Sequence, residues 1–283
     1  MDSLSEKMII QSPDTHPDIE KIQIALLRQA GVGRRISRTG SLSQTTINLS
    51  RRAILCAKPE FTEKALQSAF IAYHYGQQLS DITLKTEGIM KNPDLLAAVR
   101  PVVDAFEKLG ILYYIGGSIA SSAYGMARAT LNVDMVSDLK KQHIRPLVEM
   151  LKSSYYIDGD MIADAVSRRA SFNLIHLETM LKIDVFIIKQ GAYHEQAFKR
   201  RKKDTLDEDQ QDVEFYLVSP EDIILAKLEW YRLGGGVSDR QWHDVLGVLK
   251  VQENLLDRDY LAHWAGQLKL MDLLEKAFQG AGM

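Results

Sequence analysis

The chain has 283 residues, 35 Lys and Arg against 37 Asp and Glu, and a single cysteine. This length can form one large domain or two to three small ones, while the balanced charge excludes a global polycation for binding nucleic acid. One cysteine excludes an intramolecular disulfide, and no apolar run reaches the roughly 20 residues of a membrane span. We expect a cytoplasmic protein with no membrane partner, in which Cys56 is a packed small residue.

The first part of the chain is expected to be a helical accessory module over residues 1–90. Pro17 lies in the first turn of a helix whose apolar residues recur every three or four positions. A second helix is predicted over 43–57. A third has Thr62 as its N-cap and ends near Gly76.

A stretch rich in glycine and arginine, residues 31–41, is expected to be the loop between the first two helices. It contains Arg34, Arg35 and Arg38, which could receive a phosphate. The stretch lacks the ending of a P-loop and follows no strand, so a solvated interhelical loop is the favoured interpretation.

The sequence patterns of residues 91–200 predict both strands and helices. The predicted elements are a helix over 92–108, a strand over 111–115, a helix over 118–124, a strand over 133–139, helices over 144–153 and 161–169, and strands over 171–177 and 181–188. The fold class predicted from this order is α+β, with a small mixed sheet and helices forming a core between helical regions.

Residues 201–283 are expected to form a C-terminal helical domain. Its first helix has Ser219 as N-cap and proline at the first helical position, and further helices are predicted over 239–251, 257–265 and 271–278. Trp230 is expected in the core of this domain. The basic run 199–203 precedes an acidic run and is interpreted as a solvated hinge, with contact to a triphosphate or an RNA backbone as the alternative. Those two interpretations stay open.

Acidic residues on two predicted strands suggest a metal site. Asn132 and Asp134 are spaced by two and therefore point to the same side of a strand, and Asp184 lies in the later apolar run. Carboxylate oxygens are the ligands that Mg²⁺ prefers, with Mn²⁺ as the other candidate, so we expect Asn132, Asp134 and Asp184 to hold the metal. A carboxylate in an apolar run is also costly unless a cation pairs with it.

Glycines between a predicted strand and helix suggest a phosphate site. Gly116 and Gly117 let the backbone approach phosphates, and the helix from Ser118 points its N–H groups at them. Arg128 can balance charge between the phosphates and the acidic residues. This part of the chain is therefore expected to bind a nucleotide.

These motifs resemble the DNA polymerase β-like nucleotidyltransferase superfamily, and within it the AbiEii-type (MenT-like) toxin nucleotidyltransferases, over roughly residues 96–270. The motif of glycine-serine followed by aspartate-x-aspartate matches at Ser118 and Asp134, with Asn132 in place of the first aspartate. A later motif of serine-x-glutamate-aspartate followed by lysine matches from Ser219 to Lys227. A closing basic-x-x-aspartate motif is similar to the stretch ending at Asp244.

The resemblance implies an ATP-binding or other NTP-binding transferase of a toxin-antitoxin or defence system, with tRNA as the acceptor. It assigns catalytic roles to Asp134, Asp184, Asn132, Lys227 and Asp244. Lys227 would contact the nucleotide phosphates, and Asp244 would orient that lysine or position the acceptor. Taken without the resemblance, Lys227 would be interpreted as a surface charge.

Asn132 leaves three interpretations open, because asparagine keeps a carbonyl oxygen but lacks the negative charge. The protein is a weakened enzyme, a pseudoenzyme that binds nucleotide, or a form with an aspartate replaced on purpose; the third is narrowly favoured. The leading functional hypothesis is transfer of a nucleoside monophosphate to tRNA. The alternatives are an antitoxin-like enzyme that transfers AMP to a partner protein, and a binding or interaction module without catalysis.

Overall fold

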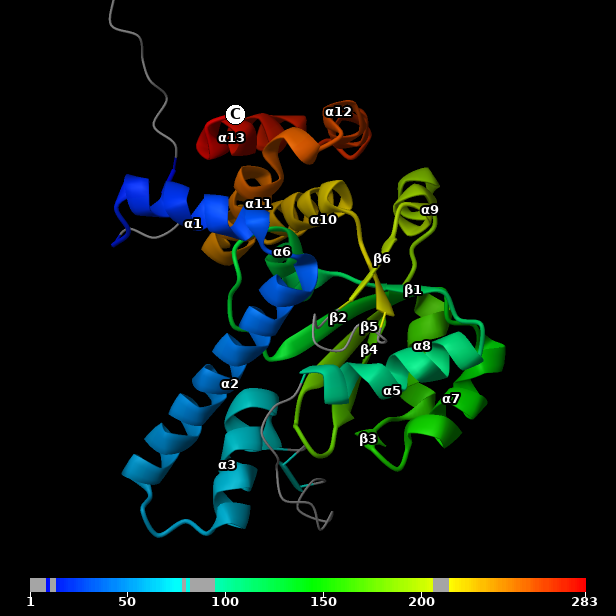
Figure 1. Ribbon diagram of the computed structural model, residues 1–283. Helices are drawn as coiled ribbons and strands as arrows, with labels where there is room; N and C mark the ends of the chain where they lie inside the picture. The colour runs from blue at the N-terminus through cyan, green and yellow to red at the C-terminus, as the bar shows by residue number, and fades with distance from the viewer. Residues whose placement is uncertain (1–8, 11–13, 78–79, 82–94, 206–213) are drawn as a thin grey trace, which may run out of the picture. The chain divides into compact units, whose positions relative to one another are not determined.

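The computed structural model describes residues 9–10, 14–77, 80–81, 95–205 and 214–283 (Figure 1). The chain folds as two compact units, each assembled from separate stretches of sequence. Unit 1 comprises residues 1–38, 114–128 and 189–283, and unit 2 comprises residues 39–113 and 129–188. The architecture is mixed α/β, as the sequence predicts, and the three consecutive domains 1–90, 91–200 and 201–283 stay a prediction. Within the described ranges no helix is both long and apolar enough to cross a membrane.

Unit 2 is built on strands in the order β3-β4-β5-β2. Their bounds are β2 Asn132–Ser137, β3 Tyr155–Tyr156, β4 Ser171–His176 and β5 Lys182–Ile187. β2 and β5 are parallel, whereas β4 pairs antiparallel with both β5 and β3. Buried and half-buried residues alternate along β2 and β5, so one face of these strands is core and the other is partly open.

Helices cover the strands of unit 2. They are α5 Leu95–Lys108, α7 Ile144–Leu151 and α8 Gly159–Arg168, with a short 3₁₀ turn η1 at Lys141–His143. α8 packs on β4 and β5. The Tyr155 hydroxyl of β3 donates to the carbonyl of Ala98 in α5 at 2.7 Å, which satisfies a phenol buried in the core.

A helical hairpin also belongs to unit 2 from Thr39 onward. α2 (Val32–Ala57) and α3 (Glu63–Tyr75) run beside each other (Figure 1). Apolar side chains of the hairpin share one buried cluster with β4 and the turn after it: Ile47, Phe70, Ile71, Ile175 and Met180. The hairpin is therefore packed on strands of the core rather than held apart from them.

The start of α2 corrects the loop expected over 31–41. The helix begins at Val32 and runs without interruption through that stretch. Gly40 has no neighbour within 4 Å of an added Cβ, so it sits in the helix without a steric role. Arg35 is buried and donates to the carbonyl of Leu27 at 3.1 Å, which joins α2 to the preceding helix. Arginine and serine are adequate helix formers, and these contacts outweigh the two glycines.

Unit 1 contains the C-terminal helices and a short strand group in which β7 pairs with parallel β1 and antiparallel β6. The strands are β1 Tyr113–Ile115, of which the last two residues belong to this unit, β6 Lys202–Thr205 and β7 Glu214–Leu217. The helices are α1 Pro17–Gln29, α6 Gly117–Tyr124, α9 Ala192–Lys199, α10 Pro220–Leu233, α11 Asp239–Gln252, α12 Arg258–Gln267 and α13 Met271–Ala281, with a 3₁₀ turn η2 at Glu253–Leu255.

The first helix, α1, packs with the C-terminal helices. Figure 1 shows α1 crossing α11, and the Lys250 ammonium of α11 pairs with the Glu20 carboxylate of α1 at 2.6 Å. Both side chains are buried. Arg28 at the other end of α1 donates to the carbonyl of Lys250 at 2.6 Å. The helices before residue 76 are thus divided between the two units.

Three further expectations need correction. The basic run is no hinge, because Lys199 ends α9 and Lys202 begins β6; most of the acidic run and the predicted helix start at Asn92 lie outside the described residues. Cys56 is exposed near the end of α2. Trp230 is 53% exposed on α10, because it lies on the face of that helix opposite the core.

Candidate active site

The turn after β1 has the backbone that the sequence predicts for a phosphate site. α6 begins at Gly117, whose φ of +52° lies in the left-handed region that favours glycine. Gly116 precedes it as the N-cap residue and accepts from the N–H of Ala120 at 3.1 Å. The N-terminal end of a helix carries a partial positive charge and N–H donors, which suit an anion.

Four side chains of unit 1, Ser118, Arg128, Lys227 and Asp244, form what we call the Asp244 cluster. Arg128 donates Nε to Asp244 Oδ1 at 2.7 Å and Nη2 to Asp244 Oδ2 at 2.8 Å, a bidentate pair. The same Nη2 donates to Ser118 Oγ at 2.7 Å. Lys227 Nζ donates to Asp244 Oδ2 at 2.7 Å. The cluster therefore holds two cations and one carboxylate beside the first turn of α6.

Burial and charge pairing determine how the ionisable side chains of this cluster behave. The Lys227 side chain is only 7% exposed, so the interpretation as a surface charge is wrong. Burial alone would raise the pKa of Asp244, but the hydrogen bonds and charges of Arg128 and Lys227 outweigh it and hold that pKa below its ordinary value. With Asp244 ionised, the cluster carries one net positive charge.

The motif before Lys227 has a structural role at its acidic end. Ser219 caps α10 by accepting from the N–H of Asp222 at 3.1 Å. Glu221 accepts from Arg200 at 2.9 Å, and Asp222 accepts from the Tyr260 hydroxyl at 2.7 Å. Burial raises the pKa of Asp222. These residues join α9 and α12 to the start of α10, and Lys227 alone extends the motif to the Asp244 cluster.

In unit 2 the predicted metal residues come together on one face of two strands. Asp134 of β2 and Asp184 of β5 are direct partners in the parallel register, and Asn132 is the partner of Lys182. All four lie on the half-buried face of their strands. We call this set, Asn132, Asp134, Lys182 and Asp184, the Asp184 face.

Lys182 is the residue of this face that the sequence reasoning missed. Its Nζ lies 2.9 Å from Asp184 Oδ1, and the Asn132 amide donates Nδ2 to Asp184 Oδ2 at 3.3 Å. The cation expected beside Asp184 is therefore a lysine of the same strand. The signal was available, because residues 182 and 184 are spaced by two just as residues 132 and 134 are.

The Asp184 face offers two carboxylates, those of Asp134 and Asp184, at partner positions of β2 and β5. Among the described residues there is no group of three or more histidine, cysteine, aspartate and glutamate side chains placed to hold a metal. Two neighbouring carboxylates are sufficient for Mg²⁺, whose other ligands are commonly waters and substrate phosphates. Tyr75 of α3 lies close by, and burial, reinforced by the charge of Asp184, raises its pKa.

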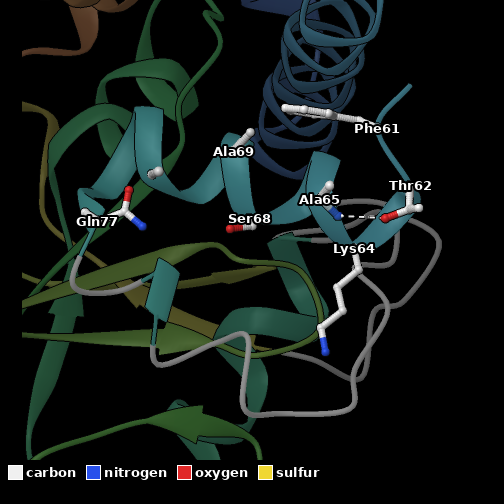
Figure 2. Close-up of a pocket in the computed structure, with 8 residues that line it drawn as sticks. Phe61, Thr62, Lys64, Ala65, Ser68, Ala69 and Gln77 are labelled. Carbon is white, nitrogen blue, oxygen red and sulfur yellow. Dashed lines mark hydrogen bonds between the residues drawn. The ribbon is translucent and has the colours of Figure 1, made fainter. Parts of the chain in front are cut away.

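The helical hairpin carries a separate hollow of about 490 Å³ along α3 (Figure 2). Thr62 caps α3 there by accepting from the N–H of Ala65 at 3.3 Å, and Lys64 extends away from the helix. No predicted site residue lines this hollow, and its walls are mostly small side chains. It therefore adds nothing to the two clusters.

No family model matches the chain. No curated protein matches it either.

Solved structures similar in part include three proteins. A lincosamide antibiotic adenylyltransferase, LnuA, with lincomycin bound, is 13% identical over 55% of this chain and 96% of its own, with a TM-score of 0.38. The antibiotic-resistance factor ANT(2'')-Ia is 12% identical over 65% and 92%, with a TM-score of 0.39. An antigenic nucleotidyltransferase-like protein from Paracoccidioides brasiliensis is 16% identical over 64% and 91%, with a TM-score of 0.38. With TM-scores this low, the three matches do not say what this chain binds or transfers.

Proposed function

We propose that the protein is a nucleotidyltransferase that moves a nucleoside monophosphate from an NTP to an acceptor, with Mg²⁺ or Mn²⁺ as cofactor. The observation that carries the proposal is the register of β2 and β5, which makes Asp134 and Asp184 neighbours on one face of parallel strands. Residues far apart in sequence are brought together at two of the three positions where the motif requires carboxylates. An arbitrary pair of exposed strand aspartates has no reason to share a register.

The chemistry requires positive groups at a triphosphate. An acceptor oxygen attacks the α-phosphorus, the bond to the bridging oxygen breaks, pyrophosphate leaves, and the proton of the acceptor passes to solvent. Catalysis of such a step is mostly positioning and stabilisation of charge. A bound Mg²⁺ would neutralise charge on the phosphate oxygens. Asp134 and Asp184 would hold it, with the Asn132 carbonyl oxygen as a weaker donor.

The Asp244 cluster supports binding of the phosphates. Arg128 and Lys227 share one carboxylate and leave a net positive charge beside the helix N-terminus at Gly117 and Ser118. Asp244 holds both cations in fixed positions, so little reorganisation is needed when an anion binds. This role for Asp244 agrees with the one that the sequence resemblance implies.

Two finer parts of the proposal rest on the sequence resemblance alone. These are tRNA as the acceptor and a toxin or defence role. AMP transfer to a partner protein is the alternative acceptor chemistry. The pseudoenzyme alternative is favoured by a specific observation, because Lys182 and Asn132 both contact Asp184 where a metal would compete with them.

The test incubates the protein with each α-labelled NTP, Mg²⁺, total cellular RNA and total protein. We expect a labelled small-RNA band that is lost in Asp184→Asn and in Lys227→Met. Asp164→Asn is the matched control, because Asp164 is an exposed carboxylate of the same unit that pairs with Arg168 at 2.8 Å. A labelled protein band would replace tRNA by a partner protein. Label that survives both site variants would contradict the proposal.

If no labelled band appears in that assay, two more measurements distinguish the remaining alternatives. Asn132→Asp restores a full negative charge at the weakened position, so we expect it to increase labelling. Thermal unfolding with NTP and Mg²⁺ then separates the pseudoenzyme, because any ligand that prefers the native state raises the melting temperature. A rise that requires Lys227, with no label from Asn132→Asp, would establish binding without transfer.

A further inference from the structure

The Asp184 face combines an absent carboxylate with an added ammonium. Position 132 carries asparagine, and its partner in the β2–β5 register is Lys182. Both side chains contact the same carboxylate, that of Asp184, on its two different oxygens. The two departures from an all-acidic site therefore lie side by side and act on one group.

The charge on this face is too small for two divalent cations. Asp134 and Asp184 contribute two negative charges and Lys182 contributes one positive charge, which leaves a net charge of −1. A pair of metal ions a few ångströms apart repels strongly and needs several carboxylates to bridge and neutralise it. The ammonium also competes directly for Asp184 Oδ1, at 2.9 Å.

Burial makes this ammonium a lasting part of the face. The side chains of Lys182 and Asp184 are 26% and 17% exposed, so water screens their interaction only in part. Lys182 also lies beside Ile175 of β4 in the antiparallel register, and Ile175 is buried by the helical hairpin. The lysine stem is therefore held along apolar surface while its charged end reaches Asp184.

We infer that Lys182 is a built-in cation that takes the place of one metal ion, so that the loaded site binds a single divalent cation. The inference rests on the proposed function and specifies its metal requirement. The ammonium neutralises one oxygen of Asp184, and the one ion would be held by Asp134 and by Asp184 Oδ2, where it would displace the hydrogen bond from the Asn132 amide. The neutral Asn132 side chain adds no carboxylate beside Lys182, so the ammonium keeps Asp184 as its partner.

The experiment titrates Mn²⁺ into the full chain and follows free Mn²⁺ by electron paramagnetic resonance. We expect one ion per chain in the unaltered protein. Lys182→Met should bind the ion at least about tenfold more tightly, since a competing positive charge is gone. Lys182→Arg should keep the weak single-ion behaviour. Lys182→Met combined with Asn132→Asp should bind two ions.

Two controls keep the outcome decisive. Lys152→Met removes an exposed ammonium paired with Glu149 at 2.6 Å in the same unit and should leave Mn²⁺ binding unchanged. Lys182→Gln keeps a polar side chain and is titrated in case the methionine variant unfolds, with circular dichroism of every variant. Two ions in the unaltered protein, an affinity of Lys182→Met and Lys182→Gln equal to that of the unaltered protein, or no Mn²⁺ binding by any variant would each overturn the inference.

Label transfer measured on the same preparations separates this inference from the proposed function. Transfer that requires Asp184, accompanied by an unchanged Mn²⁺ affinity in Lys182→Met and Lys182→Gln, defeats the inference alone. The expected ion counts without transfer in any variant defeat the proposed function alone. The two failures are therefore distinguishable.

Discussion

The Asp244 cluster and the Asp184 face both pair an aspartate with a lysine, yet they differ in burial and in net charge. Lys227 and Asp244 are 7% and 5% exposed, and Arg128 adds a second cation to the same carboxylate. Lys182 and Asp184 are 26% and 17% exposed, and a second aspartate lies alongside. A buried cluster with excess positive charge suits an anion, whereas a partly open face with excess negative charge suits a cation.

The largest expected effect is on the buried cluster. Lys227→Met removes one cation from a carboxylate that stays buried, and Arg128 remains to pair with it. Breaking a buried ion pair from one side costs on the order of 3 kcal/mol. Urea unfolding should show this loss, while Lys182→Met, at the more open face, should lose much less. Equal losses in the two variants would remove the distinction between the clusters.

The second largest effect concerns the packing between α6 and α11, the helices that carry Ser118 and Asp244. A Cβ on Gly125, just after α6, would lie 2.7 Å from backbone atoms of Gly247 and Val248 in α11. Backbone cannot yield as a flexible side chain does, so Gly125→Ala should cost on the order of 2 kcal/mol. Gly40→Ala is the matched control, because an added methyl meets nothing there, and it should stabilise α2 slightly. Melting temperatures of the two variants should therefore move in opposite directions.

Melting temperatures measured as a function of pH test the electrostatic role of Asp244 in its cluster. The pKa of Asp244 in the folded protein lies below its ordinary value. The ionised Asp244 therefore stabilises the fold fully above the pKa of the unfolded chain, which is about 4, and this stabilisation is lost as the pH falls through the folded pKa. The gap in melting temperature between the unaltered protein and Asp244→Asn should be constant from neutral pH to about 5 and close below about 4. Asp222, whose pKa is raised, is present in both proteins, so its contribution cancels in the difference between their melting temperatures. A gap in melting temperature that widened on acidification would contradict a lowered pKa for Asp244 in the folded protein.

The smallest expected effect concerns the Asp184 face. Asp184→Asn removes a partly exposed ion pair and relieves the neighbouring Asp134 of a like charge, so its cost should stay below about 1 kcal/mol. The same substitution should abolish Mn²⁺ binding and nucleotide transfer. A variant that keeps its stability but loses both activities would show that this carboxylate serves function rather than folding. A loss as large as that of Lys227→Met would point to a structural role instead.

Local signals predicted most of the regular elements. Ser219 and Thr62 cap helices as expected, because an N-cap depends on a few neighbouring residues. Residues 31–41 were predicted wrongly as a loop, since helix formation there depends on packing such as that of Arg35. The strands β6 and β7 were not predicted, because short strands gain their stability from partners distant in sequence.

The sequence by itself determined which chemistry-bearing residues the chain has and the local backbone that carries them, including the glycine turn at Gly117. Only the tertiary structure decided their partners. It buried Lys227 against Asp244 and set Lys182 beside Asp184, where the sequence suggested a surface charge and a metal ion. The physical reason is that spacing along the chain fixes the face on which a side chain lies, whereas burial and charge pairing depend on register and packing between elements far apart in sequence.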